Sequence, residues 1–228
     1  MTTPPNDRHT VSAFDQDLEQ IRNLIARMAT LADEAIGTAM AALVSGDTDK
    51  AADVVRRDAE VDALQHELER QTVRLIALRA PLADDLRSAV AALKIASFVE
   101  RIADYAKTIA KRVKAVEGLD KLDASAILPR MATTVAGMVR DATAAYLAHD
   151  AVAAEAVRGR DEEVDASYRE LFLALVGRMM NDPATVQSAT ALMFVAKSLE
   201  RIGDHATNIA ENVYYAVTGE QMVDRHER

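Results

Sequence analysis

Residues 100–113 read ERIADYAKTIAKRV, and residues 200–213, one hundred positions later, read ERIGDHATNIAENV. Eight of these 14 positions are identical, and apolar residues recur every three or four positions, as on one face of a helix. A second echo precedes each stretch, because residues 57–64 read RDAEVDAL and residues 160–167 read RDEEVDAS. The chain therefore contains two copies of one helical unit.

The composition supports a helical protein. The 228 residues include only 8 Gly and 5 Pro, 50% are hydrophobic and 4% are aromatic, with no Trp. Few helix breakers and many Ala, Leu, Glu and Arg residues are typical of long helices with thin aliphatic cores. We predict an all-α fold of two tandem three-helix bundles, with six long antiparallel helices and a separate core in each unit.

Turn residues divide the chain into these helices. Gly46 and Gly219 follow apolar periodic segments, whereas Pro81, Pro129 and Pro183 are placed near helix starts. The predicted helices span residues 14–44, 48–78, 82–117, 128–148, 150–180 and 183–217. The first unit then covers residues 13–118 and the second covers residues 123–219, between loose polar segments at residues 1–12 and 220–228.

Carboxylates at a spacing of four are the polar feature that both units keep. Residues four apart stack on one helix face, where like charges destabilise the helix by about 0.2–0.5 kcal/mol per pair. A bound cation would remove that cost, and Mg²⁺, Mn²⁺, Ca²⁺ and iron all accept carboxylate oxygens. The predicted metal ligands are Asp58, Asp62, Glu100 and Asp104 in the first unit, and Asp161, Asp165, Glu200 and Asp204 in the second.

The helical pattern predicts where these acids lie. Apolar stripes run along the second, third and sixth helices, with the acids on their flanks or opposite faces. We therefore expect the acids at the surface, near a groove between helices. The stripes comprise Val54, Val61, Leu64, Leu68 and Leu75; Val99, Ile102, Ala106, Ile109, Val113 and Val116; and Leu199, Ile202, Ala206, Ile209, Val213 and Val217.

Other interpretations of the acids remain open. A solvated acidic face, partly neutralised by Arg101 and Arg201, needs no metal. A di-iron carboxylate bundle is disfavoured because no Glu or Asp is followed by His at the third position. No phosphate-binding loop or nucleophile–base pair is readable, so we predict no catalytic residue. His205 could touch a metal beside Asp204, but a surface histidine is the favoured interpretation.

Charge and residue usage limit the partners. With 36 acidic and 27 basic residues, the net charge is −9, which disfavours nucleic-acid binding and docking on anionic membranes. Cys is absent, which fits a reducing compartment, and we expect a cytoplasmic protein. No uninterrupted apolar stretch is long enough to insert into a membrane.

With these residues in view, the chain resembles the PhoU family of bacterial phosphate-signalling regulators. The resemblance rests on ERIADYA, on ERIGDHATNIAENVYYAVTG, and on the two tandem units. The first copy departs from the family pattern at Ala103, Thr108 and Lys111, which predicts a weaker metal site there than in the second copy.

The resemblance implies a regulator rather than an enzyme. It implies an adaptor that represses phosphate-starvation genes by acting with the ATPase subunit of a phosphate ABC transporter and with a sensor histidine kinase. It also implies a homodimer with metal on the acidic motifs, with Mg, Mn, Fe or Zn all candidates. A metal-dependent enzyme using the same carboxylates and a purely structural helical dimer are the alternatives.

Overall fold

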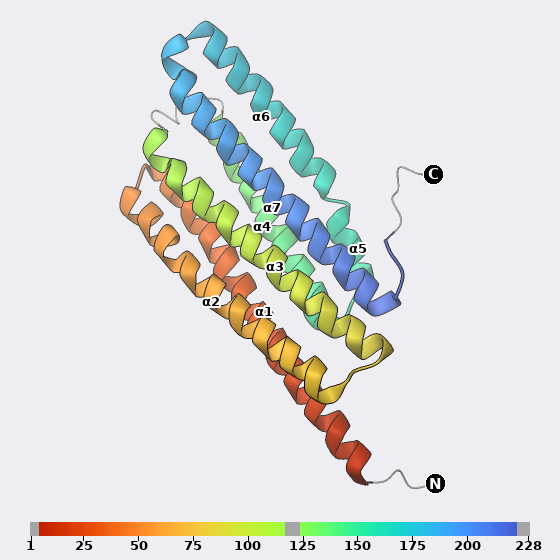
Figure 1. Ribbon diagram of the computed structural model, residues 1–228. Helices are drawn as coiled ribbons and strands as arrows, with labels where there is room; N and C mark the ends of the chain where they lie inside the picture. Colours follow the sequence, from red (N-terminus) through yellow and green to blue (C-terminus); the bar gives the residue numbers. More distant parts are fainter. Residues whose placement is uncertain (1–4, 117–123, 223–228) are drawn as a thin grey trace.

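The computed structural model describes residues 5–116 and 124–222, and within them every regular element is a helix (Figure 1). The α-helices are α1 (Pro5–Ser45), α2 (Thr48–Arg79), α3 (Ala83–Arg112), α4 (Ala124–Ala148), α5 (Ala151–Arg158), α6 (Asp161–Asn181) and α7 (Val186–Thr218). Short 3-10 turns, Val113–Ala115 and Pro183–Thr185, extend α3 and precede α7. The predicted all-α class is confirmed.

Several helix ends lie where the turn residues predicted them. The Asp47 side chain caps α2 by accepting hydrogen bonds from the backbone N–H groups of Asp49 and Lys50, and Asp150 caps α5 in the same way. Gly219 ends α7 in the left-handed region, with φ 76°, where glycine has no Cβ to clash. These caps satisfy backbone groups that the helix ends would otherwise leave unpaired.

Two of the predicted helix starts are wrong. The loose segment at residues 1–12 is helical from Pro5 onward, because proline fits the first turn of a helix, where its missing N–H costs nothing; residues 1–4 lie outside the described residues. Helix α4 begins at Ala124, so Pro129 lies inside the helix rather than in its first turn.

The predicted fifth helix is interrupted. Gly159 and Arg160 form a turn between α5 and α6, and glycine is a poor helix former. Arg160 stabilises the break by donating from Nη1 to Asp141 of α4 at 2.7 Å and from Nη2 to the Thr134 carbonyl at 3.3 Å. Gly137 leaves room for this guanidinium, since a Cβ there would lie 2.8 Å from Arg160 Nη2. Asp161 consequently becomes the first residue of α6.

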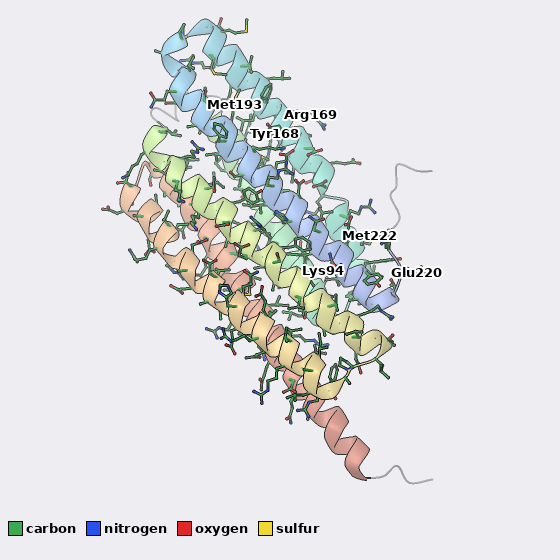
Figure 2. All side chains as sticks on the ribbon, viewed as in Figure 1. Lys94, Tyr168, Arg169, Met193, Glu220 and Met222 are labelled. Carbon is green, nitrogen blue, oxygen red and sulfur yellow. The ribbon has the colours of Figure 1, made fainter. Side chains whose placement is uncertain are left out.

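The two three-helix sets meet along α3 and α7. Phe98 and Tyr105 of α3 stack on His205, and Arg112 lies over the Phe194 ring at 4.5 Å, so the two helices run antiparallel. At one end, Lys94 of α3 and Met222 beyond α7 line a groove of about 520 Å³ (Figure 2).

The two units share one core. The buried residues of both units form a single continuous hydrophobic cluster, so the expectation of separate cores is wrong. The reason is that α3 and α7 pack directly against each other. Each of them also buries a second, alanine-rich face against the outer helices of its own unit: Ala103 lines a cleft with residues of α1 and α2, and Gly203 lies against Val135 of α4 and Val164 of α6. This face includes Ala89, Ala92, Ala96 and Ala103 on α3, and Ala189, Ala196, Gly203 and Ala210 on α7.

The predicted stripes themselves are largely confirmed. All residues named for α2, α3 and α7 are buried or packed against the core, except Val217, which is 39% exposed near the end of α7. The flanks of these stripes position the acidic residues.

A shared core predicts one cooperative unfolding transition. Ile102 and Ile202 occupy equivalent places and are both fully buried. Truncating either to Ala removes buried methyl groups and leaves a cavity, which should cost about 2–5 kcal/mol. Calorimetry of Ile102→Ala and of Ile202→Ala should each show a single unfolding transition with a lower melting temperature than that of the wild type. Splitting into two transitions, with only one displaced, would contradict a shared core.

Candidate functional site

In the first unit the acids gather between α2 and α3. The Asp58 side chain is 7% exposed, that of Glu100 is 19% exposed, and that of Asp104 is 40% exposed. Asp58 was expected at the surface and is instead buried, because α2 packs against both α1 and α3, so its flank is covered. The pKa of Glu100 is raised, mainly because the carboxyl group is buried and also because Asp104 repels its charge.

Lys107 occupies the centre of this first cluster. Its ammonium donates hydrogen bonds to Asp58 Oδ2 across the helix interface and to Asp104 Oδ1 at 3.2 Å. The hydrogen bond to Asp58 is the main reason that the pKa of Lys107 is raised. The lysine thus supplies positive charge where the sequence predicted a metal ion.

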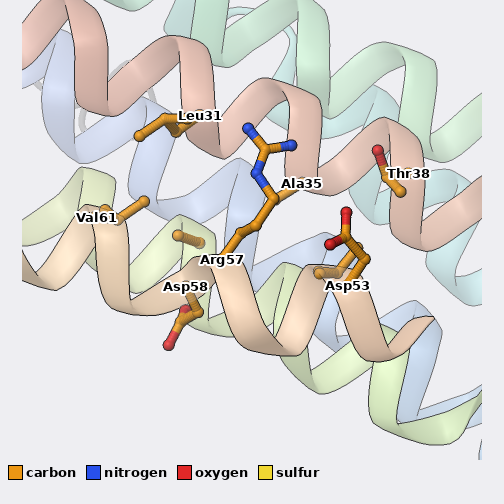
Figure 3. Close-up of a pocket in the computed structure, with 9 residues that line it drawn as sticks. Leu31, Ala35, Thr38, Asp53, Arg57, Asp58 and Val61 are labelled. Carbon is orange, nitrogen blue, oxygen red and sulfur yellow. The ribbon is translucent and has the colours of Figure 1, made fainter. Parts of the chain in front are cut away.

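A narrow cleft on the other side of α2 does not add to this site. Figure 3 shows Arg57 pointing toward α1, while the Asp58 carboxylate points the opposite way. Arg57 donates to Glu34 Oε2 of α1 at 3.0 Å. The cleft measures about 20 Å³, which is room for about one water molecule.

In the second unit the acids gather between α6 and α7, with a different charge balance. Burial raises the pKa of Asp161, and the charges of Asp165, Asp204 and Glu200 raise it further. The four predicted ligands therefore repel one another across the two helices. Position 207 is Thr, so no ammonium stands where Lys107 stands in the first unit.

Two cations of the second cluster come from α7 itself. Arg201 Nη1 donates to Asp204 Oδ2 at 3.1 Å, and Lys197 forms an ion pair with Glu200 Oε2. The Lys197 side chain is 42% exposed, and its ammonium lies 5.3 Å from the Tyr168 ring. Both pairs join residues three apart on one helix, and such exposed pairs add little stability.

Two buried polar atoms of α7 near this second cluster lack hydrogen-bond partners in the part of the chain that the structure describes, namely His205 Nδ1 and Thr207 Oγ1. Glu200 Oε2 has the Lys197 ammonium as its partner. Leaving such groups unsatisfied costs about 1–3 kcal/mol each. Oxygen donors with excess negative charge suit a hard cation. Within the described residues, however, no three His, Asp or Glu side chains are placed to hold one ion together.

The favoured interpretation of His205 as a surface residue is wrong. Its ring lies between Phe98, at 5.8 Å, and Tyr105, at 5.7 Å between centroids. Burial at this contact lowers the pKa of His205. The sequence did not reveal it because the stacking partners lie on the other unit, at α3.

Sequence reasoning also missed three residues at the clusters. Lys107 donates a hydrogen bond to Asp58 in the first cluster, and Thr207 stands at the equivalent position in the second. Glu211 adds negative charge near Asp161. Glu211 lies 3.9 Å from Arg158 Nε. The available signal was the set of positions at which the two repeats differ, because all three residues occupy such positions.

The geometry defines a class of all-α proteins in which two tandem three-helix units carry acidic clusters at equivalent places. The sequence model of the PhoU domain matches residues 25–113 and 128–213, so the chain belongs to the PhoU family. The membership implied by ERIADYA and ERIGDHATNIAENV is thereby confirmed.

Relatives match along nearly the whole chain. A phosphate-specific transport system accessory protein PhoU homolog from Zymomonas mobilis is 48% identical, covering 95% of this chain and 92% of its own. One from Caulobacter vibrioides is 43% identical, with 95% of each chain covered. The crystal structure of PhoU from Pseudomonas aeruginosa is 31% identical with a TM-score of 0.84, over 91% of this chain and all (100%) of that one.

Equivalent aspartates should respond oppositely to one substitution. Asp58→Asn removes the buried partner of Lys107 and should lower the free energy of unfolding by about 1.5–3 kcal/mol. Asp161→Asn relieves repulsion and should raise it by roughly 0.5 kcal/mol. Chemical denaturation in excess chelator measures both, with wild type as the reference. Equal losses in the two variants would mean that Asp161 is neutralised as Asp58 is.

Proposed function

We propose that this protein is a negative regulator of phosphate uptake and phosphate-starvation signalling. It acts as an adaptor between a phosphate ABC transporter, through the ATPase subunit, and a sensor histidine kinase. The observation that carries this proposal is PhoU family membership over both units, with curated relatives named as accessory proteins of a phosphate-specific transport system. The proposed place of action is the cytoplasm, where both partners would present soluble domains.

The surface of the molecule supports an adaptor better than a phosphate receptor. A net charge of −9 repels free phosphate, and the acidic clusters concentrate that charge in two grooves. None of the described helices is both long and apolar enough to cross a membrane. Exposed apolar side chains on α6, including Phe172 at 42%, Leu173 at 70% and Met180 at 80%, offer area for contact with a protein, either a partner or a second copy in a homodimer.

The proposal includes one divalent metal or iron ion in the second unit. Asp161 and Asp165 from α6, with Glu200 and Asp204 from α7, would hold it through carboxylate oxygens. The mutual repulsion around Asp161 supports this assignment. When bound, the ion would supply positive charge that draws α6 and α7 together.

Two rival functions are weaker. A metal-dependent enzyme would need a nucleophile or general base beside the carboxylates, and the described residues of the second cluster are mainly carboxylates and their cationic neighbours. A purely structural dimer gives no role to the repulsion among the carboxylates of the second cluster.

Loss of the regulator should derepress starvation genes. A strain lacking this gene should express a phosphate-starvation reporter in high phosphate, and the wild-type gene on a plasmid should restore repression. From high-phosphate cells, tagged protein should recover the transporter ATPase subunit or the kinase. Normal repression in the deletion strain, with neither partner recovered, would contradict the proposed adaptor function. Purified protein should hydrolyse no phosphate ester.

Metal content should depend on the second cluster. Glu200→Gln combined with Asp204→Asn keeps side-chain volume and removes two charges, so bound Mn²⁺ or iron should fall to background in elemental analysis. Stability without metal should hold or rise slightly, since repulsion is relieved. Unchanged metal content in this double variant would place the ion elsewhere.

A further inference from the structure

Lys107 joins the two helices of the first cluster. Its ammonium contacts Asp58, whose side chain is 7% exposed, and Asp104 at 3.2 Å. The lysine side chain is itself only 26% exposed, so this is a partly desolvated pair with charge-assisted hydrogen bonds from two helices. Such a cation is held more firmly than a surface lysine.

The second cluster lacks this arrangement. Thr207 stands at the equivalent position, and its hydroxyl is buried without a hydrogen-bond partner. The lysine of the second cluster, Lys197, comes from one turn before Glu200 on the same helix and is 42% exposed. Its printed contact with α6 is the Tyr168 ring, 5.3 Å from the ammonium, and not a carboxylate, so it can turn into solvent without breaking an ion pair between helices.

We propose that Lys107 is a built-in counter-ion that closes the first cluster to metal, leaving the second cluster as the only metal site of the two. The second half of this statement rests on the proposed function; the first half does not. A metal ion and the Lys107 ammonium would occupy the same space between Asp58 and Asp104, and their like charges exclude joint occupancy. Divergence at one position, Lys107 against Thr207, thus assigns a structural role to one cluster and a ligand-binding role to the other.

The test compares Lys107→Thr with Lys94→Thr in the full-length protein. Thr is the residue that the second unit carries at this place, and Lys94 is an exposed lysine in the interior of the same helix, so the helix-propensity change is matched. In excess chelator, Lys107→Thr should melt about 2–4 °C or more below Lys94→Thr, because Asp58 loses its buried partner. Added Mn²⁺ should then recover more of the melting temperature in Lys107→Thr than in wild type.

The number of Mn²⁺ ions bound per protein molecule provides a second test. Glu100→Gln with Asp104→Asn should leave the Mn²⁺ content of the wild-type background unchanged, whereas Lys107→Thr should gain up to one further equivalent. A fall in Mn²⁺ content on changing Glu100 and Asp104 would overturn the proposal, as would identical melts of the two lysine variants in chelator. If no variant takes up Mn²⁺, the metal of the proposed function is wrong, and the chelator melts alone decide the role of Lys107.

Discussion

Close packing of α3 against α7 is the constraint on which the rest of this molecule depends. Phe98 and Tyr105 of α3 stack on His205 of α7, and the antiparallel course of the two helices makes equivalent positions meet. Tyr105 stacks on His205, its own counterpart in the other unit, so an approximate two-fold axis passes near this pair. The other faces of α3 are covered by α1 and α2, and those of α7 by α4, α5 and α6. The two acidic clusters lie where α2 packs on α3 and where α6 packs on α7.

The two grooves show how one replacement changes the electrostatics of a shared design. Both units supply two aspartates from one helix and a Glu/Asp pair from the next. In the first unit an ammonium bridges the helices and pairs with Asp58 and Asp104, while burial and the charge of Asp104 still raise the pKa of Glu100. In the second unit the carboxylates mainly face one another, which raises the pKa of Asp161. Desolvation strengthens both the attraction to Lys107 and the repulsion among the carboxylates of the second unit, because charges interact more strongly away from water.

Much of the fold could be predicted because it depends on local patterns. Apolar periodicity located the helices and the buried stripes, and Asp47 and Gly219 marked ends by their cap chemistry. Periodicity identifies an apolar face but not the neighbour that covers it. The shared core, the burial of Asp58 and the stacking of His205 therefore could not be foreseen, since each arises from contacts with a second helix.

The candidate site was predicted in its residue types and not in its charge state. Comparing the repeats drew attention to identical positions, and the acids at those positions lie near one another in each unit. That they bind metal stays a prediction. The difference between the grooves lies at the positions that diverge, above all Lys107 and Thr207. Repeat identity indicates what two sites share, so an argument about which site binds a ligand must begin from the positions where the repeats disagree.

The break between α5 and α6 adds a mechanical difference to the electrostatic one. Asp58 lies inside the continuous helix α2, whereas Asp161 is the first residue of α6, directly after the Gly159–Arg160 turn. A helix N-terminus favours a carboxylate through its exposed N–H groups and dipole, which partly offsets the repulsion that Asp161 feels. The turn also separates α6 from α5. A cation that drew Asp161 toward Glu200 would act at the pivot of α6, the same helix that presents Leu173 and Met180 to solvent. In the proposed function, ligand binding and a contact surface would therefore be carried by one helix, which would couple a bound ion to a protein partner.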